Sequence, residues 1–328
     1  MTIHLTASEK SYLWTNYMID SMAVCILKYY IEKCEDEEIK EVLLYALDLS
    51  KLHVDTAANI LSDENFPLPK GFTDEDVNLS APRLFSDEFV LFYLHQFANL
   101  GLSYYAKAIS MVAREDVHEF YKECISSSTE LNARTKELLL KKGLYVRPPY
   151  IPDPPESETI EKIGYLKGYL GEKRPLMGLE ISNLFFNIQT LEVVKVLLKG
   201  FAQVAKSKDV RDYLTRGKKI CMKSIKVLRE RLERDELASS TPWYTFVSDS
   251  TTPPFSDPLI MFQGAVLYGA GIEQFGYSIA TMMRRDIGVL YAQLLTEMMT
   301  YSDDGMNLLI KNHWMEQPPM AMKRNEQK

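Results

Sequence analysis

The stretch FSDEFVLF at residues 85–92 recurs as FSDPLIMF at residues 255–262, an offset of 170 positions. The same offset aligns other identical residues: Gly101 with Gly271, Arg114 with Arg284, Asp116 with Asp286, and Pro148-Pro149 with Pro318-Pro319. An offset of 171 aligns the parts that come earlier: Glu9 with Glu180, Leu13 with Leu184, Asn16 with Asn187, and Leu43 with Leu214. So many agreements without gaps indicate one structural unit used twice, with a length change of one residue between its halves.

Each copy contains four long segments with helical periodicity. They cover 6–34, 36–63, 86–112 and 115–143 in the first copy, and 177–206, 208–236, 257–283 and 285–312 in the second. Very short turns join the segments in pairs, and a long connection (64–85 or 237–256) joins the two pairs. Two helical hairpins with one long connection follow the plan of a ferritin-like bundle. The sequence therefore predicts an all-α fold: two tandem ferritin-like four-helix bundles related by internal duplication.

Prolines between 148 and 155 indicate a linker between the copies. We expect a first bundle over 1–150, a Pro-rich linker over 151–174, a second bundle over 175–319 and a disordered tail over 320–328. Within the linker, residues 156–170 are predicted to form a short extra helix.

The composition describes a globular protein and excludes some function classes. Of 328 residues, 46% are hydrophobic and 25% charged, which is ordinary for a soluble protein. The net charge of -7 argues against a general nucleic-acid binder, which needs a basic surface. The chain shows no secretory signal and no run of 18 apolar residues, so we expect a cytoplasmic protein without a membrane span. The four cysteines have no metal-type spacing and are expected to be buried thiols.

Polar residues fall on the inward helical stripes of the first copy. They are Glu9, Asn16, Asp20, His53 and His95. Three of the matching positions in the second copy hold Leu191, Ser224 and Ala265. Buried polar groups cost about a few kcal/mol each unless they are paired. They therefore predict an internal hydrogen-bond network or a metal site, since His and carboxylates on facing helices hold iron or manganese in bundles.

Spacing favours the network. A di-iron bundle needs two Glu-x-x-His tetrads, and the chain has one, Glu115 to His118, at the start of a helix. Glu9, His53 and His95 are the only carboxylate–imidazole set on facing helices. A ferritin-type crossover would place His95 roughly 13 Å from His53 along the bundle. We therefore expect no cofactor, and an Fe, Mn or Zn site at Glu9, His53 and His95 is the alternative.

The second helices of the two copies carry opposite charge. Residues 35–64 contain nine acids and two lysines, a net of -7, and residues 206–234 contain eleven bases and four acids, a net of +7. Two solvated outer faces would explain this pattern. The alternative is that the faces complement each other, within the chain or between subunits.

Nearly the whole chain resembles a known family. The stretches that carry the resemblance are EISNLFFNIQT (180–190), GFAQVAKSKDVRDYLTRGKKI (200–220), PFSDPLIMF (254–262), MRRDIGVLY (283–291) and YSDDGMNLLIKNHWMEQPP (301–319). They are similar to tandem ferritin-like proteins of spore-forming bacilli, a family of unknown function with distant similarity to spore coat protein F. The resemblance implies the fold and a coat association, but no reaction.

The family pattern has His at positions that match Asn183, Ser224 and Gln263. This chain has no His at any of the three, which puts metal binding by the second bundle in doubt. His53 occupies the position in the first copy that is equivalent to Ser224.

These observations favour a non-catalytic structural or interaction protein associated with the spore coat. Its expected partners are itself or other coat-type proteins, and no catalytic residue is assigned. One alternative is a metal-binding ferritin-like protein with oxidase or peroxide-handling activity. Another is a bundle that binds an apolar ligand, suggested by the 19 Tyr, 14 Phe and 15 Met residues.

Overall fold

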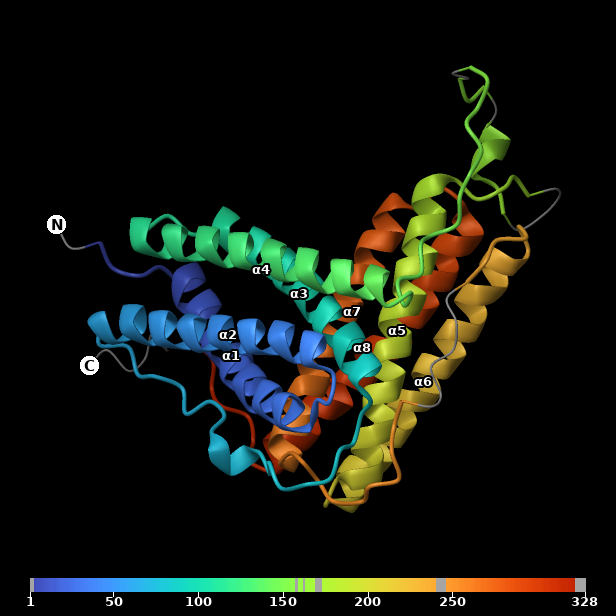
Figure 1. Ribbon diagram of the computed structural model, residues 1–328. Coiled ribbons are helices and arrows are strands. Elements are labelled where there is room, and N and C mark those ends of the chain that lie inside the picture. Colours follow the sequence, from blue (N-terminus) through green and yellow to red (C-terminus); the bar gives the residue numbers. More distant parts are fainter. Residues whose placement is uncertain (1–2, 157–158, 162, 169–172, 240–245, 322–328) are drawn as a thin grey trace. The chain divides into compact units, whose positions relative to one another are not determined.

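A computed structural model describes residues 3–156, 159–161, 163–168, 173–239 and 246–321. These residues contain eight α-helices (Figure 1): α1 (Ala7–Lys33), α2 (Glu37–Asp63), α3 (Asp87–Ser110), α4 (Glu115–Lys141), α5 (Gly178–Val204), α6 (Lys208–Glu233), α7 (Asp257–Thr281) and α8 (Arg285–Lys311). Two 3-10 turns, η1 (Asp74–Asp76) and η2 (Ile163–Leu166), complete the regular structure. The predicted all-α fold with four long helices per copy is confirmed.

The first three helices begin where the sequence supplies side-chain acceptors for the free N–H groups of a first turn. The Thr6 hydroxyl accepts from the N–H of Glu9, and the Glu9 carboxylate accepts from the N–H of Thr6, so α1 starts with a capping box. The side chains of Asp36 and Ser86 cap α2 and α3 as simple N-caps, by accepting from N–H groups of the first turn. These local signals explain why predicted and observed helix bounds agree within a few residues.

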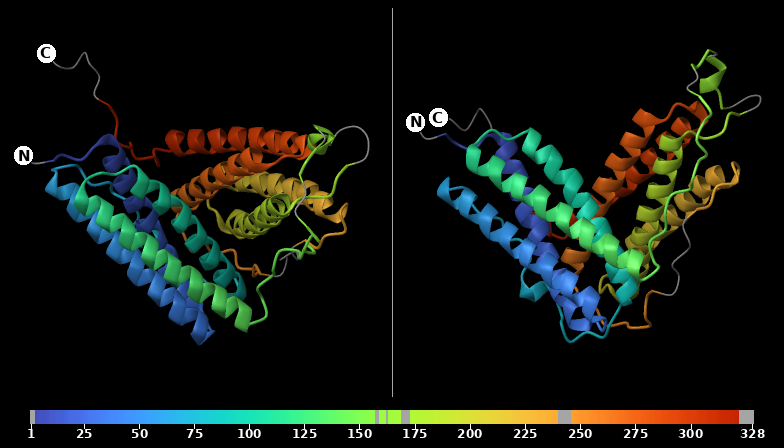
Figure 2. Two further views of the ribbon diagram at one scale, coloured as in Figure 1. Left: turned by 90° about the horizontal axis from the view of Figure 1, so that it is seen from above. Right: turned by 45° about the horizontal axis from the view of Figure 1, so that its top comes forward.

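Contacts at the helix ends fix the course of the first four helices. Near the start of α1, Glu9 accepts from the N–H groups of Ala113 and Arg114, which precede α4. Near the other end of α1, Asp87 at the start of α3 accepts from the N–H groups of Glu35 and Asp36. The connection from α2 to α3 therefore returns along the length of the bundle, and α3 runs antiparallel to α1. Both views in Figure 2 show α1 beside α2, and α3 beside α4.

The compact units of the chain differ from its sequence repeats. The first unit comprises residues up to 144 together with 252–263 and the described residues from 309 onward, and the second comprises the described parts of 145–251 and 264–308. Phe255 is buried in the first unit, with its ring centroid 5.2 Å from that of Tyr29. The Ser256 N–H donates to the Asp76 carbonyl at 2.9 Å. The bounds 1–150 and 175–319 expected from the sequence follow the repeats, and as domain bounds they stay a prediction.

The helix expected over residues 156–170 does not form in the described part of that stretch. Residues 159–161 and 167–168 are irregular, and the one turn is η2. Gly168 approaches Asp286 so closely that an added Cβ would lie 1.9 Å from the carboxylate. Because glycine also disfavours helix, Gly164 and Gly168 explain the break. Positions 157–158, 162 and 169–170 of the expected helix, and most of the tail expected over 320–328, lie outside the described residues.

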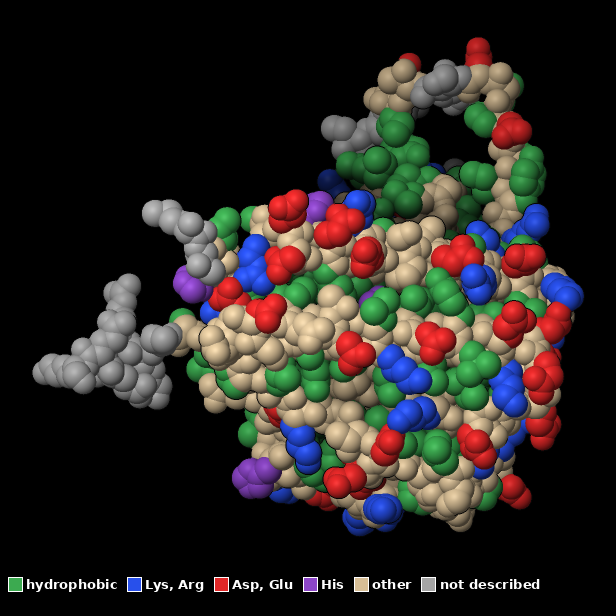
Figure 3. Space-filling view, turned by 60° about the vertical axis from the view of Figure 1, so that its left-hand side comes forward, with side chains coloured by type: hydrophobic (Ala, Val, Ile, Leu, Met, Phe, Trp, Pro, Cys, Tyr) green, Lys and Arg blue, Asp and Glu red, His purple; other side chains and the backbone are tan. Residues whose placement is uncertain are grey.

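Exposed apolar side chains are scattered among charges of both signs on the face shown in Figure 3, which is usual for a globular protein. Among the described residues, α5 is the one helix long and apolar enough to cross a membrane by length and composition. Most of that apolar window is buried within the folded chain, as in a core helix.

Candidate functional site

Glu9, one of the three proposed metal ligands, is fully engaged by hydrogen bonds. Its Oε2 accepts from the N–H of Thr6 at 2.7 Å and from the Thr6 hydroxyl at 2.8 Å. Its Oε1 accepts from the N–H groups of Ala113 and Arg114 at 2.9 and 2.8 Å. Burial by itself would raise the pKa of Glu9, but these donors lower the pKa to about 2. The carboxylate therefore joins the start of α1 to the start of α4.

Arg114 extends this contact to two further carboxylates. Its Nε and Nη2 donate to the two oxygens of Asp116, both at 2.7 Å, which is the bidentate geometry of a strong pair. Its Nη1 donates to Glu64, just after α2, at 2.6 Å. Glu9, Glu64, Arg114 and Asp116 thus hold three helix ends together. We call these four residues the helix-end network of the first copy.

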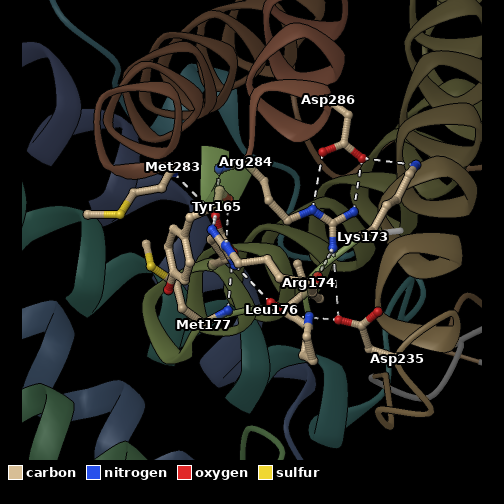
Figure 4. A network of polar contacts seen from close by, with 11 residues as sticks. Tyr165, Lys173, Arg174, Leu176, Met177, Asp235, Met283, Arg284 and Asp286 are labelled. Carbon is tan, nitrogen blue, oxygen red and sulfur yellow. Dashed lines mark hydrogen bonds and ion pairs between the residues drawn. The ribbon is translucent and has the colours of Figure 1, made fainter. Parts of the chain in front are cut away.

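The second copy contains an equivalent network, formed by Glu180, Asp235, Arg284 and Asp286 at the positions that match those four. Figure 4 shows Arg284 between Asp235 and Asp286. Glu180 is completely buried and accepts from the N–H groups of Met283 and Arg284 at 3.2 and 2.9 Å. Arg284 donates to both oxygens of Asp286 at 3.1 and 2.9 Å. Asp235 lies 4.0 Å from Arg284 and accepts from the Leu176 N–H.

Arg174 adds a contact in the second copy. Its two Nη atoms donate to the two oxygens of Glu180 at 2.8 and 2.9 Å. Its guanidinium also lies over the ring of Tyr165, 4.2 Å from the centroid. Burial would raise the pKa of Glu180, but Arg174 and the backbone donors lower it. The buried carboxylate is therefore charged and neutralised within the network.

His53 belongs to a separate polar cluster in the middle of the first unit. Its Nδ1 lies 3.5 Å from Oδ2 of Asp20 and 3.4 Å from the hydroxyl of Tyr105. The Asn16 amide donates to the same Asp20 oxygen at 2.6 Å. The ring of Phe120 contacts His53 edge-on, with centroids 5.9 Å apart. His53 therefore pairs with polar groups of the first helix, as an internal network predicts.

His95, the third proposed ligand, is bonded elsewhere. Its Nδ1 lies 2.9 Å from the hydroxyl of Thr135 on α4. Burial, together with the charge of Lys136, lowers the pKa of His95 to about 4. The imidazole is therefore neutral near pH 7.

The structure does not bring Glu9, His53 and His95 together. Glu9 lies at the end of the bundle where α2 and α3 finish. His53 precedes the last residue of α2 by 10 positions, or roughly 15 Å, and His95 precedes that of α3 by 15 positions, or roughly 22 Å. Among the described residues, no group of three or more His, Cys, Asp or Glu side chains could hold a metal ion. The helical stripes identified which positions face inward, but not how far along the bundle axis each of them lies.

The second unit has a buried charge cluster that the stripes missed. Glu192 and Lys195, both on α5, are bonded to each other, and Arg229 on α6 donates to Glu192 at 3.2 Å. Glu192 follows Leu191, which stands at the position equivalent to Asp20. The signal was present in the sequence as a Glu-x-x-Lys pair inside the apolar run LEVVKVLL, where charges are costly unless paired.

A cavity in the second unit bears on the apolar-ligand alternative. It has a volume of about 10 Å³ and is lined by Asn187, Leu191, Cys221, Tyr268 and neighbouring side chains. That volume holds one water at most, whereas ligand pockets occupy about 300–1,000 Å³. This cavity does not support binding of an apolar ligand.

The four cysteines are buried and free, in agreement with the sequence prediction. Burial raises the pKa of Cys25, Cys34 and Cys221 to about 12, so these thiols are protonated and poorly nucleophilic near pH 7.

A family model described as protein of unknown function, DUF3231, matches residues 1–156 and again residues 165–326. The chain belongs to the DUF3231 family. The two tandem matches confirm the internal duplication and the family resemblance found in the sequence. No curated protein matches the chain significantly.

Among solved structures, this DUF3231 chain is similar to a candidate spore coat protein from Bacillus halodurans C-125, with a TM-score of 0.41 and 18% sequence identity. The similarity covers 46% of this chain and 98% of that chain.

Proposed function

We propose that this chain is a non-catalytic structural or interaction protein of the spore coat. The observation that supports this most is the helix-end network, which occurs in both copies. Glu9 and Glu180 accept backbone N–H groups, while Arg114 and Arg284 form bidentate pairs with Asp116 and Asp286. These shared polar residues join helix ends, which is an architectural role.

The polar groups that chemistry would need differ between the copies. The Asp20–His53 contact of the first copy is matched by Leu191 and Ser224 in the second. The second copy instead has Glu192 and Lys195, one and four residues after Leu191, and these two side chains are bonded to each other. A duplicated scaffold that varies in its polar interior is what we expect when the scaffold itself is the useful part.

The coat association rests on the family resemblance of the sequence stretches quoted above. We propose synthesis in the cytoplasm followed by incorporation into the coat. Contacts there would be with other copies or with other coat-type proteins. The ferritin-like classification of each bundle belongs to this proposal, and the antiparallel course of α1 and α3 supports it.

Fractionation of spores tests the location. We expect the protein in the fraction that detergent and alkali extract from intact spores, and its depletion from the lysate of decoated spores. Both fractions would be probed with an antibody against the chain, and a soluble cytoplasmic enzyme would serve as the control for leakage. If the protein follows the cytoplasmic enzyme into the lysate of decoated spores, the coat assignment is wrong.

A further inference from the structure

The outward face of α2 carries unpaired acids between exposed leucines. Glu41, Asp48 and Asp55 are exposed, and no hydrogen bond or ion pair joins their carboxylates to the described residues. Leu44 and Leu52, on the same face, are 46% and 56% exposed. We call these five residues the acidic face. Lys51, also exposed on this side of α2, lowers the net charge of the face from -3 to -2, so the face stays acidic.

The outward face of α6 has the opposite charge. Lys219 and Lys226 are exposed, without an ion pair to the described residues, and Met222 between them is 47% exposed. Arg216 and Lys223 lie alongside, each in an exposed pair with an α8 carboxylate. We call these five residues the basic face.

The two faces occupy equivalent positions in the two copies. The offset of 171 aligns Asp48 with Lys219 and Asp55 with Lys226. Each pair of charges is therefore seven residues, or roughly 10 Å, apart along its helix. One surface position of the repeated unit thus carries acids in the first copy and bases in the second.

The apolar residues match when the two helices run antiparallel. On α2 the steps from Asp48 to Leu52 to Asp55 are four and three residues. On α6, read backwards, the steps from Lys226 to Met222 to Lys219 are also four and three. Antiparallel alignment therefore sets Leu52 against Met222, with a carboxylate facing an ammonium group on either side.

We infer that the acidic face of α2 binds the basic face of α6 of a second copy of this chain. The inference rests on the proposed function and gives the coat component a partner. Each copy has both faces, so a pair of bound copies still has a free acidic face on one copy and a free basic face on the other. Such a head-to-tail contact continues into a ring or a filament. Exposed ion pairs contribute little individually and are screened by salt, so the contact is weak and salt-sensitive.

Sedimentation velocity of the full-length, untagged protein tests the contact. At about 20 mM salt the average mass should exceed that of a monomer and rise with protein concentration. At about 1 M salt, where the Debye length is roughly 3 Å, it should fall to the monomer mass. A wild-type protein that stays monomeric at low salt over a hundredfold range of concentration would overturn the inference.

Charge reversal identifies the surfaces. The double variants Asp48→Lys/Asp55→Lys and Lys219→Glu/Lys226→Glu should each sediment as monomers, because like charges then face each other. The quadruple variant should associate again, because the signs are merely exchanged. Glu123→Lys/Glu137→Lys, which alters two exposed acids of α4, makes the same charge change as the α2 variant and should associate like the wild type.

Two results would contradict the inference in different ways. If the quadruple variant stays monomeric while its circular dichroism remains helical, the two faces do not bind each other. If the double variants change the scattering radius but not the mass, the contact lies within one chain rather than between copies. If the protein is found in the coat fraction but never self-associates, this inference is wrong and the proposed function stands. If the protein is absent from the coat, the proposed function is wrong.

Discussion

Replacement of Gly217 by Ala is expected to lower the free energy of unfolding by about 3 kcal/mol, because a well-packed core resists added volume. The new Cβ would lie 2.3 Å from the hydroxyl oxygen of Tyr301 and 2.7 Å from that of Tyr268. Neither ring can withdraw easily. Tyr301 stacks on Tyr213 with centroids 4.2 Å apart, and each hydroxyl donates to the backbone carbonyl of the other residue.

Gly305 provides a reciprocal test of the same contact, since a Cβ there would lie 2.2 Å from the Tyr213 hydroxyl. Gly269 is the control, because it is also helical and an added Cβ would meet nothing within 4 Å. Gly269→Ala should stabilise the protein by about 0.5–1 kcal/mol through its better helix propensity. Chemical denaturation measures all three variants. Equal stability of Gly217→Ala and Gly269→Ala would refute the tyrosine contact.

Truncation of Glu180 is the second large effect. Glu180→Ala should cost about 4 kcal/mol, because it leaves the Arg174 guanidinium and the N–H groups just before α5 and α8 without their acceptor. Glu9→Ala should cost less, about 3 kcal/mol, because its lost donors include no side-chain cation.

The pH dependence separates this role from simple packing. The pKa of the Glu9 carboxyl is about 2 in the folded chain and 4.5 in the unfolded chain. Its contribution to the free energy of unfolding is therefore present above pH 4.5 and is lost as the pH falls towards 2. Glu9→Gln should therefore be less stable than the wild type at pH 7 and approach it near pH 2. If the difference between Glu9→Gln and wild type were constant over that range, the helix-end network would not depend on the charge.

The helices were predictable because their signals are local. Periodicity, the Thr6 and Asp36 caps and the short turns all act within a few residues. The division into compact units was not predictable in that way. Phe255 belongs to the second repeat yet is buried beside Tyr29 and Tyr30. This contact joins residues far apart in the chain, so no periodic pattern in the sequence indicates it.

The polar interior was predictable in part. The stripes correctly placed Glu9, Asn16, Asp20 and His53 inside, and the pairing of His53 with the first helix followed from the cost of unpaired burial. The sequence also contains the signal for the capping role of Glu9, since Thr6 and Glu9 have the spacing of a capping box. The contacts with Ala113 and Arg114 were not, because they depend on which helix ends meet.

We propose that the polar interior serves the architecture, and the metal content of the purified protein can decide between that role and a metal site. Protein prepared without an affinity tag should contain no stoichiometric iron, manganese or zinc by plasma mass spectrometry. His53→Ala should leave that result unchanged while costing about 1–3 kcal/mol of stability through the lost contacts with Asp20 and Tyr105. Stoichiometric metal in the wild type that is absent from His53→Ala would make His53 a ligand and contradict the account in favour of a metal-dependent oxidase.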